Sequence, residues 1–280
     1  MSIILKGNEL KNLYCEELKA SVKKYIDTEG IIPCLSSILI GNDGGSIFYV
    51  NFQRKICDSM GIRYNLIRFD EDAKEKEVID AIQSLNMDNN IHGIILQVPL
   101  PKHLDEKRII SYIDPRKDVD SLTDSNVGRL FKGERCFEPC TPKAVIEIIK
   151  NAGINIEGKR AVVVGRSNIV GKPLAIMLLK NNATVTVCHS KTKNLRDVTK
   201  EADILISCVG IPNMIKKYHI KEGAVVIDVG TSNVNGKMKG DVDFEEVKNK
   251  ASYITPVPGG VGSVTTMMLL QNTMKALERI

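Results

Sequence analysis

A tyrosine and a glutamine share one face of a predicted helix in the stretch "SIFYVNFQRK" (46–55). Tyr49 lies four residues before Gln53, the spacing that puts two side chains on the same side of a helix. Arg54 and Lys55 are about 140° and 240° further round the helix from Tyr49, at 3.6 residues per turn. An active site built here therefore has an uncharged amide, and no cation, beside the tyrosine.

A second amide and a group of carboxylates occupy positions where α/β proteins bind ligands. Gln97 ends the apolar run "IHGIILQV" (91–98), and the carboxyl end of a parallel strand is a common place for ligand contacts. A glutamine that only caps the sheet edge is the other interpretation. The segment "PRKDVDSLTDSNVGRL" contains Asp118 and Asp120 but no histidine and no glycine-centred calcium loop. We expect one buried carboxylate that binds a donor-rich ligand, and no metal.

A strand, a glycine turn and a helix are predicted in "AVVVGRSNIVGKPLAIMLLKN" (161–181). Such a turn lets backbone N–H groups and a helix N-terminus face a pyrophosphate. Gly165 permits the tight turn and Gly171 permits close packing. Ser167 takes the second glycine position of the GxGxxG pattern, so a structural βαβ crossover without a nucleotide stays open.

The next strand favours NADP over NAD. After "VTVC" come Ser190, Lys191 and Thr192, where an NAD enzyme usually has an acid for the ribose diol. Arg166 lies in the glycine turn. Cations and hydroxyls suit a ribose 2′-phosphate, although Arg166 and Lys191 can also be read as solvated surface charges.

The densest glycine–proline cluster of the chain is "TPVPGGVG", which leads directly into an apolar helix. Backbone can approach a ligand closely at Gly259 and Gly260, next to Pro258. A purely structural turn is the alternative. We expect a binding loop.

These residues need a scaffold of alternating strands and helices. Near-continuous apolar strands joined by helical crossovers predict an α/β fold with parallel sheets covered on both faces. Helices are expected at about 46–60, in "KEKEVIDAIQSL", after Pro142 and from Ser263 to Ile280. The expected strands are 34–41, 62–69, 91–98, 161–165, 183–188, 203–209 and 224–230.

We predict two domains. Residues 1–138 form an N-terminal α/β substrate domain, onto which a C-terminal helix of residues 265–280 packs back. Residues 139–264 form a Rossmann-like domain that binds the nucleotide and includes the linker helix after Pro142. The linker helix and the C-terminal helix bridge the two domains, and a cleft between domains is a common ligand site.

Composition excludes several classes of protein. The 280 residues carry a net charge of +5 from 39 basic and 34 acidic side chains spread along the chain, so we expect no nucleic-acid partner. No apolar stretch is long enough for a signal peptide or a membrane span. An odd number of cysteines without a CxxC pair predicts reduced thiols in a cytoplasmic protein. The cysteines are residues 15, 34, 57, 136, 140, 188 and 208.

The ordered set of segments resembles the methylenetetrahydrofolate dehydrogenase/cyclohydrolase family of one-carbon metabolism, over nearly the full chain. The matching segments are "GIILQVPLP", "KDVD", "NVGRL", "PCTP", "VVVGRSNIVGKP", "CHSKT", "VIDVG", "GDVDF" and "TPVPGGVG". The resemblance implies a homodimer of two-domain chains, with folate in the interdomain cleft and NADP on the Rossmann-like domain.

The resemblance also implies roles for individual residues. Tyr49 packs on the pterin ring, Gln97 is the active-site amide, and Asp120 accepts hydrogen bonds from the pterin. The folate pocket near the cofactor is lined by Pro258, Gly259 and Gly260. The resemblance implies Arg166, Ser167 and Ser190 at the cofactor, and we also predict Gly165, Lys191 and Thr231 there.

The largest departure from the family pattern is at Gln53, where the bifunctional members have a lysine four residues after the tyrosine. Hydride removal from the methylene carbon needs no protein base, because the two flanking folate nitrogens stabilise the cation. Hydrolysis of the methenyl product needs proton transfer, which an amide cannot perform. Losing a general acid or base typically costs about 10²–10⁴-fold in rate.

The leading hypothesis is therefore an NADP-dependent methylenetetrahydrofolate dehydrogenase with weak or absent cyclohydrolase activity. A fully bifunctional enzyme, in which Lys55 or ordered water covers the loss, is the first alternative. A catalytically inactive NADP-binding regulatory protein is the second.

Overall fold

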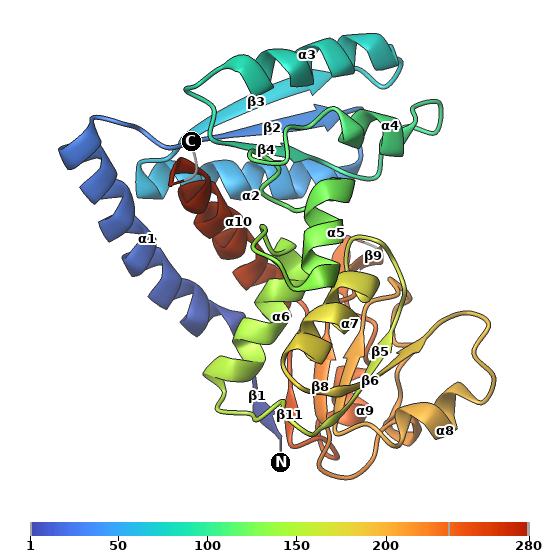
Figure 1. Cartoon of the computed structure of the whole chain (residues 1–280). Coiled ribbons are helices and arrows are strands. Elements are labelled where there is room, and N and C mark those ends of the chain that lie inside the picture. The colour runs from blue at the N-terminus through green and yellow to red at the C-terminus, as the bar shows by residue number, and fades with distance from the viewer. Residues whose placement is uncertain (1, 235, 279–280) are drawn as a thin grey trace. The chain divides into compact units, whose positions relative to one another are not determined.

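The computed structural model describes residues 2–234 and 236–278 and contains two compact units (Figure 1). Unit 1 consists of the described residues up to Asn12 together with Pro139–Met268. Unit 2 consists of Leu13–Glu138 together with the described residues from Leu269 onward. Each unit has its own parallel sheet, as the apolar strands predicted.

Unit 2 is built on a three-stranded sheet in the order β3-β2-β4. The strands are β2 (Cys34–Ile40), β3 (Arg63–Phe69) and β4 (Gly93–Leu96), and both pairings are parallel. Every residue of the central strand β2 is buried. This burial explains its continuous apolar pattern, which has no polar alternation.

Helices cover both faces of this sheet (Figure 1). Apolar side chains of α3 and α4 join those of β2 and β4 in one core that includes Ile38, Ile82 and Ile109. The helix α2 packs against β2 and β3 and lies on the opposite side of the strands from α3. The helices within unit 2 are α2 (Gly44–Met60), α3 (Glu75–Met87), α4 (Glu106–Ser111) and α5 (Asp124–Lys132).

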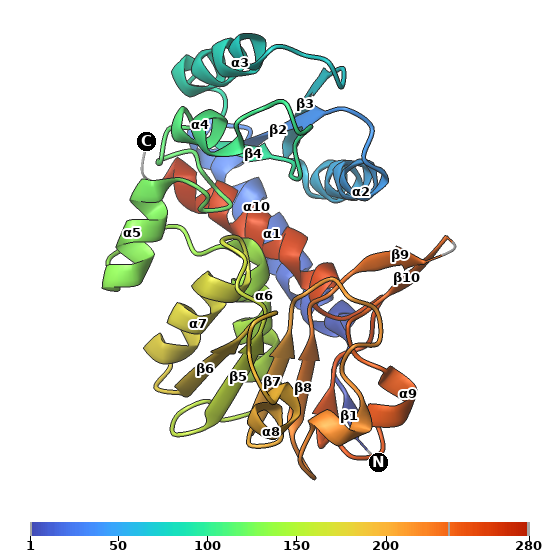
Figure 2. The same ribbon diagram turned by 90° about the vertical axis from the view of Figure 1, so that its right-hand side faces the viewer.

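Unit 1 is built on a six-stranded sheet in the order β1-β11-β8-β7-β5-β6, with all pairings parallel. Figure 2 shows β6, β5, β7 and β8 side by side. The strand β5 comes first in the chain order β5, β6, β7, and in the sheet it lies between the other two. The next two strands therefore lie on opposite sides of β5, which makes a topological switch point between β5 and β7. The strands are β1 (Ile3–Ile4), β5 (Arg160–Val164), β6 (Thr184–Cys188), β7 (Ile204–Ser207), β8 (Val225–Asp228) and β11 (Tyr253–Ile254).

The helices of unit 1 enclose an apolar core. On one face, Leu195 and Val198 of α8 and Phe244 and Val247 of α9 pack with buried strand residues, while α7 contacts β5, β6 and α6. A short hairpin joins β9 (Ser232–Val234) to β10 (Lys237–Lys239). The helices are α6 (Cys140–Asn151), α7 (Gly171–Lys180), α8 (Leu195–Thr199) and α9 (Phe244–Val247), with a 3-10 turn at Lys217–His219.

Two long helices have residues in both units. The helix α1 (Gly7–Glu29) is divided after Asn12, and α10 (Val261–Leu277) is divided after Met268. The sequence predicted α10, although residues 279–280 of the expected helix lie outside the described part. It did not single out α1, whose mean hydropathy is low and whose apolar face is weakly marked.

The predicted domain boundaries need one correction. Residues 1–12 were expected in the N-terminal domain, but β1 pairs with β11, which places them in unit 1. The linker helix after Pro142 is α6, and it lies within unit 1, the unit that contains the predicted 139–264 domain. The helices whose residues are shared between the units are α1 and α10.

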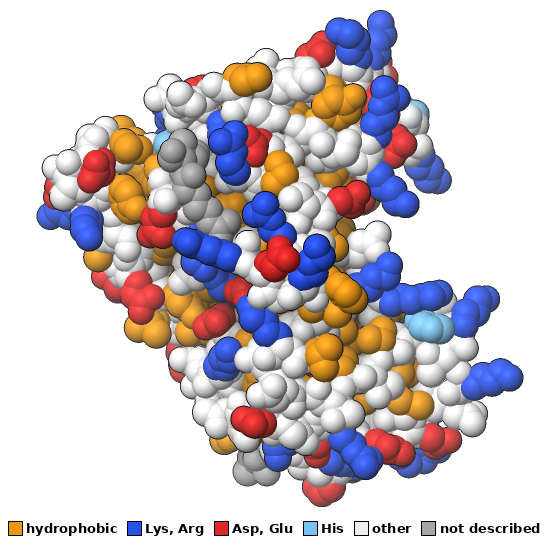
Figure 3. Space-filling model, in the orientation of Figure 1, with side chains coloured by type: hydrophobic (Ala, Val, Ile, Leu, Met, Phe, Trp, Pro, Cys, Tyr) orange, Lys and Arg blue, Asp and Glu red, His pale blue; other side chains and the backbone are white. Residues whose placement is uncertain are grey.

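Charged side chains of both signs lie on the surface (Figure 3). On the face shown in Figure 3, basic and acidic side chains are interspersed. No helix among residues 2–234 and 236–278 is long and apolar enough to cross a membrane.

Candidate functional site

The helix α2 presents the first group of candidate residues. Its start is capped by Asp43, whose carboxylate accepts a hydrogen bond from Ser46 N at 2.8 Å. Its end is capped by Gly61 in the left-handed conformation, with φ of 76°. Between these caps, Gln53 is 5% exposed and faces the unit 2 core, and Tyr49 is partly buried one turn earlier. The predicted common face of Tyr49 and Gln53 is confirmed.

The two candidate amides of unit 2 are in direct contact. Gln97, 7% exposed, follows β4. Its Nε2 donates to Gln53 Oε1 at 3.2 Å and to Ser37 Oγ at 3.0 Å. The structure therefore brings together, from a helix and a strand end, two residues that the sequence singled out separately.

A third polar residue completes this cluster and was missed from the sequence. Tyr64, on β3, donates its hydroxyl hydrogen to Gln53 Oε1 at 2.9 Å. Burial raises the pKa of Tyr64 to about 12, so the phenol stays protonated at neutral pH. The tyrosine sits in a run of partly buried β3 residues, and nothing in its local sequence distinguishes it from an ordinary strand aromatic.

Asp120 lies in a loop that runs alongside β4. A parallel bridge joins Ile94 to Asp118, and Ile94 N donates to Lys117 O at 2.7 Å. The chain from Asp118 to Asp120 therefore runs in the direction of β4, toward the strand end that carries Gln97. Asp120 is partly buried there.

The buried carboxylate of this loop is Asp118, which is 1% exposed. It accepts hydrogen bonds from Leu122 N at 2.9 Å and from the backbone and hydroxyl of Thr123 at 2.8 and 2.7 Å. The side chain of Asn126 donates a further bond at 2.9 Å. The expected buried carboxylate therefore exists, but Asp118 binds its own loop. Asp120 is the carboxylate that stays a candidate for a ligand.

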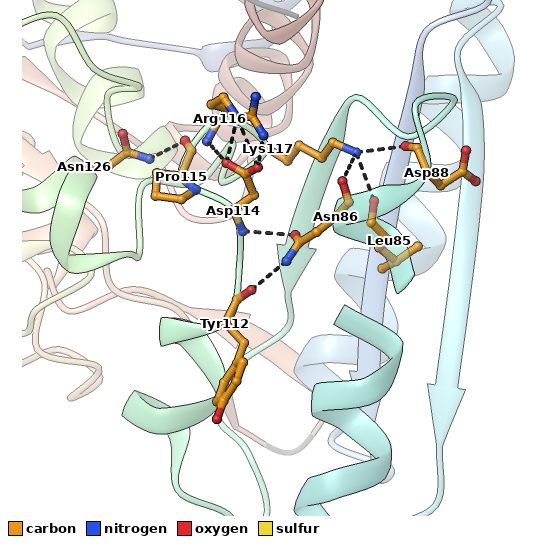
Figure 4. Close-up of polar contacts among 9 residues, drawn as sticks. All are labelled: Leu85, Asn86, Asp88, Tyr112, Asp114, Pro115, Arg116, Lys117 and Asn126. Atoms are coloured by element: carbon orange, nitrogen blue, oxygen red, sulfur yellow. Dashed lines mark hydrogen bonds and ion pairs between the residues drawn. The ribbon is translucent and has the colours of Figure 1, made fainter. Parts of the chain in front are cut away.

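A buried lysine anchors the start of the same loop (Figure 4). Lys117 is 4% exposed, and its Nζ donates to the carbonyls of Leu85, Asn86 and Asp88 at 3.0, 2.8 and 2.8 Å. These carbonyls lie at the C-terminal end of α3, where helix carbonyls lack partners. Burial lowers the pKa of Lys117.

The side chain of Asn86 makes a second link between α3 and the loop. It donates to Tyr112 O at 2.7 Å and accepts from Asp114 N at 3.0 Å. From the other side, Asn126 donates to Pro115 O at 2.9 Å. The backbone on both sides of residue 115 is thus fixed by side chains from two helices (Figure 4).

We expect Lys117→Met to destabilise unit 2 and to weaken folate binding. The substitution keeps most of the side-chain volume but leaves three helix carbonyls without their donor, at a cost of at least about 2 kcal/mol. Urea unfolding and calorimetric titration with tetrahydrofolate measure the two effects. Lys107→Met, at an exposed position on α4, is the control. Equal effects of the two substitutions would contradict the anchoring role.

The predicted nucleotide loop of unit 1 lies at the switch point of the sheet. Gly165 follows β5 with φ of 131°, and a Cβ there would lie 2.5 Å from Cys208 Sγ, just after β7. A Cβ on Gly171 would lie 2.3 Å from Gly165 O. Both glycines are therefore needed for close packing of the turn, and Gly171 also opens α7.

The polar residues of this loop have different surroundings. Ser167 Oγ accepts from Val170 N at 3.2 Å and Gly171 N at 3.3 Å, so it caps the start of α7 itself. Arg166 in this loop is exposed, and so are Ser190 and Lys191 in the loop after β6.

Strand pairing puts the cations of unit 1 at one sheet edge. In the register of β5 and β6, Val164 lies opposite Cys188. The turn with Arg166 and the loop with Ser190 and Lys191 therefore leave the same edge. A helix N-terminus, two cations and a hydroxyl fit the phosphates of NADP.

Two buried aspartates support the neighbouring loops. Asp241 accepts from Ser207 Oγ, Val209 N and Ile211 N at 2.9, 2.7 and 2.8 Å, which fixes the chain after β7. Asp228 accepts from Gly230 N at 3.1 Å, just before the exposed Thr231.

Asp228 also binds the segment that carries Asp241. It accepts from Asp241 N at 3.0 Å and Val242 N at 2.9 Å. Burial raises its pKa to about 7, while the backbone donors oppose the shift.

The stability of unit 1 should fall as pH rises from about 4 to 7. The native pKa of Asp228 lies above its unfolded value of 3.8, so over this range the folded state binds more protons than the unfolded state. The slope from one such group is at most about 1.4 kcal/mol per pH unit. Melting curves across this range should show the decline. The decline should flatten in Asp228→Asn and persist in Asp197→Asn, at an exposed position of α8. An unchanged slope in Asp228→Asn would contradict the assignment.

The glycine–proline loop belongs to unit 1. Gly259 has φ of 97°, and its carbonyl accepts from Gly7 N at 2.8 Å. A Cβ on Gly260 would lie 2.4 Å from Pro256 O, so glycine is required there by the loop's own backbone. Pro258 is exposed. These three folate candidates and the nucleotide loop lie in unit 1, whereas Tyr49, Gln97 and Asp120 lie in unit 2.

Comparison with known proteins decides the family. Residues 5–120 match the model of the tetrahydrofolate dehydrogenase/cyclohydrolase catalytic domain, and residues 139–280 match that of the NAD(P)-binding domain of the same family. The chain belongs to the tetrahydrofolate dehydrogenase/cyclohydrolase family. The resemblance inferred from the motifs is confirmed, as are the two-domain α/β class and the Rossmann-like second domain.

Relatives in this family match end to end. The "Bifunctional protein FolD" of Clostridium novyi (strain NT) is 56% identical over 278 residues, covering 99% of this chain and all of that protein. The solved structure of the bifunctional enzyme FolD, methylenetetrahydrofolate dehydrogenase/cyclohydrolase, from Campylobacter jejuni has a TM-score of 0.96 at 44% identity, with both chains fully covered. The Trypanosoma brucei enzyme, solved with NADP cofactor and inhibitor, has a TM-score of 0.95 at 37% identity. The match covers 99% of this chain and 98% of the trypanosomal chain.

Proposed function

We propose that the chain oxidises 5,10-methylenetetrahydrofolate to 5,10-methenyltetrahydrofolate with NADP. The observation that carries this proposal is the match of both domains to one enzyme family, with relatives that span the whole chain. NADP as the cofactor is supported by the trypanosomal neighbour and by the cations after β5 and β6.

The chain's own contribution to oxidation is to hold the folate. Tyr49 packs on the pterin, Asp120 accepts its N–H donors, and Gln97 offers an amide at the end of β4. When bound, NADP accepts the hydride, and Arg166 and Lys191 hold its phosphates. Since the folate nitrogens stabilise the cation, no side chain must take a proton, and positioning supplies most of the rate gain, up to about 7–11 kcal/mol.

Hydrolysis of the methenyl product is a second candidate activity, on which two observations point in opposite directions. The relatives' name, bifunctional, favours a chain that catalyses both steps. The buried amide of Gln53, bonded to Gln97 and Tyr64, favours slow hydrolysis, because none of these three side chains exchanges protons readily at neutral pH. On the names alone, the bifunctional alternative is the better supported of the two.

A paired assay separates these possibilities. NADPH formation from methylenetetrahydrofolate, with NAD tested in parallel, measures oxidation. Loss of isolated methenyltetrahydrofolate above the spontaneous rate measures hydrolysis. Oxidation without hydrolysis supports the hypothesis, based on the amide at Gln53, of a dehydrogenase with weak or absent cyclohydrolase activity. Measurable rates of both reactions support the bifunctional alternative. Neither rate, with NADP binding retained, would favour an inactive nucleotide-binding protein.

Other features of the proposal follow from the family resemblance. We propose a folate domain formed mainly by unit 2 and an NADP domain formed by unit 1. A homodimer in the cytoplasm also stays a prediction, which sedimentation and cell fractionation can test.

A further inference from the structure

The Gln53–Gln97 pair is held by a hydroxyl from a third element. Tyr64 Oη donates to Gln53 Oε1 at 2.9 Å, and Gln97 Nε2 donates to the same oxygen at 3.2 Å. With Gln97 Nε2 placed by its bond to Ser37 Oγ, the Gln53 amide satisfies both neighbours when its oxygen accepts from each of them. A flipped amide would turn its own N–H groups toward the N–H donor of Gln97, and the Tyr64 hydroxyl would have to accept instead of donate.

This arrangement leaves one donor group and one acceptor for a ligand. Nε2 of Gln53 and Oε1 of Gln97 make no hydrogen bond with any residue in 2–234 or 236–278, and neither is among the buried atoms that lack a partner. Both atoms therefore keep contact with solvent. The pair presents N–H groups from Gln53 and a carbonyl oxygen from Gln97.

The ring of Tyr64 is itself held in place. The Arg54 guanidinium lies over it, 5.8 Å from the ring centroid. The cation next to Gln53 in the sequence thus packs on the tyrosine that orients Gln53.

We propose that Tyr64 is a positioning residue for the folate reaction, which fixes the donor and acceptor directions of the Gln53–Gln97 pair. The inference rests on the proposed function and deepens it. Without the hydroxyl, the Gln53 amide can rotate, and Gln97 loses a fixed acceptor for its N–H group. The substrate then binds next to Gln53 and Gln97 side-chain amides that adopt more than one orientation.

A double-mutant cycle tests this role. Tyr64→Phe keeps the ring for Arg54 and removes only the hydroxyl, and Gln53→Met removes the amide at similar volume. We expect Tyr64→Phe to lower the kcat for oxidation by about 3- to 10-fold, the range of one neutral hydrogen bond. The KM for NADP should not change. In the Gln53→Met background, Tyr64→Phe should change the kcat by less than about twofold, because the bond is already absent.

Two controls keep the result interpretable. Tyr112→Phe tests another partly buried tyrosine of unit 2 and should leave the kcat unchanged. The side-chain amide NMR signals of Gln53, assigned by their loss in Gln53→Met, report orientation without any assay. They should broaden or shift in Tyr64→Phe and stay in place in Tyr112→Phe.

The outcomes distinguish this inference from the proposed function. An active wild-type protein whose kcat and amide signals do not respond to Tyr64→Phe overturns the role of Tyr64 alone. Equal effects of Tyr64→Phe in both backgrounds also overturn it, because the tyrosine would then act independently of Gln53. A wild-type protein that neither binds folate nor reduces NADP overturns the proposed function itself, and with it the role of Tyr64 in catalysis.

Discussion

Gln53→Lys should accelerate hydrolysis of methenyltetrahydrofolate by about 10²–10⁴-fold over the unsubstituted protein, the usual contribution of a general acid or base. The substitution puts a titratable amine at a buried position, 5% exposed, in contact with Gln97. Burial lowers the pKa of a lysine, which brings its proton exchange toward neutral pH. Spectroscopic loss of isolated methenyltetrahydrofolate measures the rate.

The pH dependence of the gain adds a second signature. Gln53 does not titrate, and the pKa of Tyr64 is about 12, so neither side chain gives a titration step in hydrolysis between pH 6 and about 9. The lysine variant should show a new step in that range. Oxidation should change much less, because it needs no proton transfer from this position.

Asn51→Lys is the matched control for this substitution. Asn51 is exposed on the same helix and lies off the face shared by Tyr49 and Gln53, so the extra charge should not affect hydrolysis. If the unsubstituted protein already hydrolyses its substrate quickly, and Gln53→Lys adds nothing, the proton is carried by another group. The bifunctional alternative would then hold.

Gly171→Ala should weaken NADP binding by about 10²-fold. The new Cβ would lie 2.3 Å from Gly165 O and 2.8 Å from Arg166 N, both backbone atoms that cannot move aside as a side chain can. The start of α7 must shift away from the turn after β5. Misplacement of about 1 Å in a binding site can cost two orders of magnitude. Calorimetric titration with NADP measures the loss.

The glycine effect should stay within unit 1. Overpacking typically costs about 1–3 kcal/mol of stability, so a melting curve must first show that the variant is folded. Tetrahydrofolate binding, which we propose for unit 2, should be retained. Gly128→Ala is the control, because Gly128 lies on the helix α5 and, apart from its chain neighbours and the nearby backbone of α5, no atom lies within 4 Å of the new Cβ. It should leave NADP binding unchanged, and equal losses in the two variants would contradict the steric argument.

Periodic and strongly apolar features of the fold could be predicted from the sequence. The helix α2 was expected at about 46–60 and spans Gly44–Met60, and the shared face of Tyr49 and Gln53 followed from their spacing. The buried strands β2 and β5 were equally clear, because both lie in the interior of parallel sheets. For these elements the local sequence pattern was sufficient, because the spacing of apolar residues along the chain determines which residues are buried.

Long-range pairing could not be predicted. The two-residue strand β1 pairs with β11, about 250 residues later, and no local signal in "SIILK" specifies that partner. For the same reason residues 1–12 were placed in the wrong domain. A short strand gains its stability from the sheet that it joins, and its own propensity is small.

The candidate site was predictable only in part. Polar residues at strand ends pointed to Gln97, but Tyr64 contacts Gln53, and Ser37 contacts Gln97, only after folding. Asp118 and Asp120 could not be told apart by spacing. The structure shows that Asp118 accepts hydrogen bonds from donors of its own loop.

The most direct test of the central claim is NADPH formation by the purified protein from 5,10-methylenetetrahydrofolate and NADP. We predict that NADPH absorbance rises only when both compounds are present, and that NAD in place of NADP gives a slower rate. A protein that binds NADP and tetrahydrofolate but produces no NADPH would contradict the assignment as a methylenetetrahydrofolate dehydrogenase.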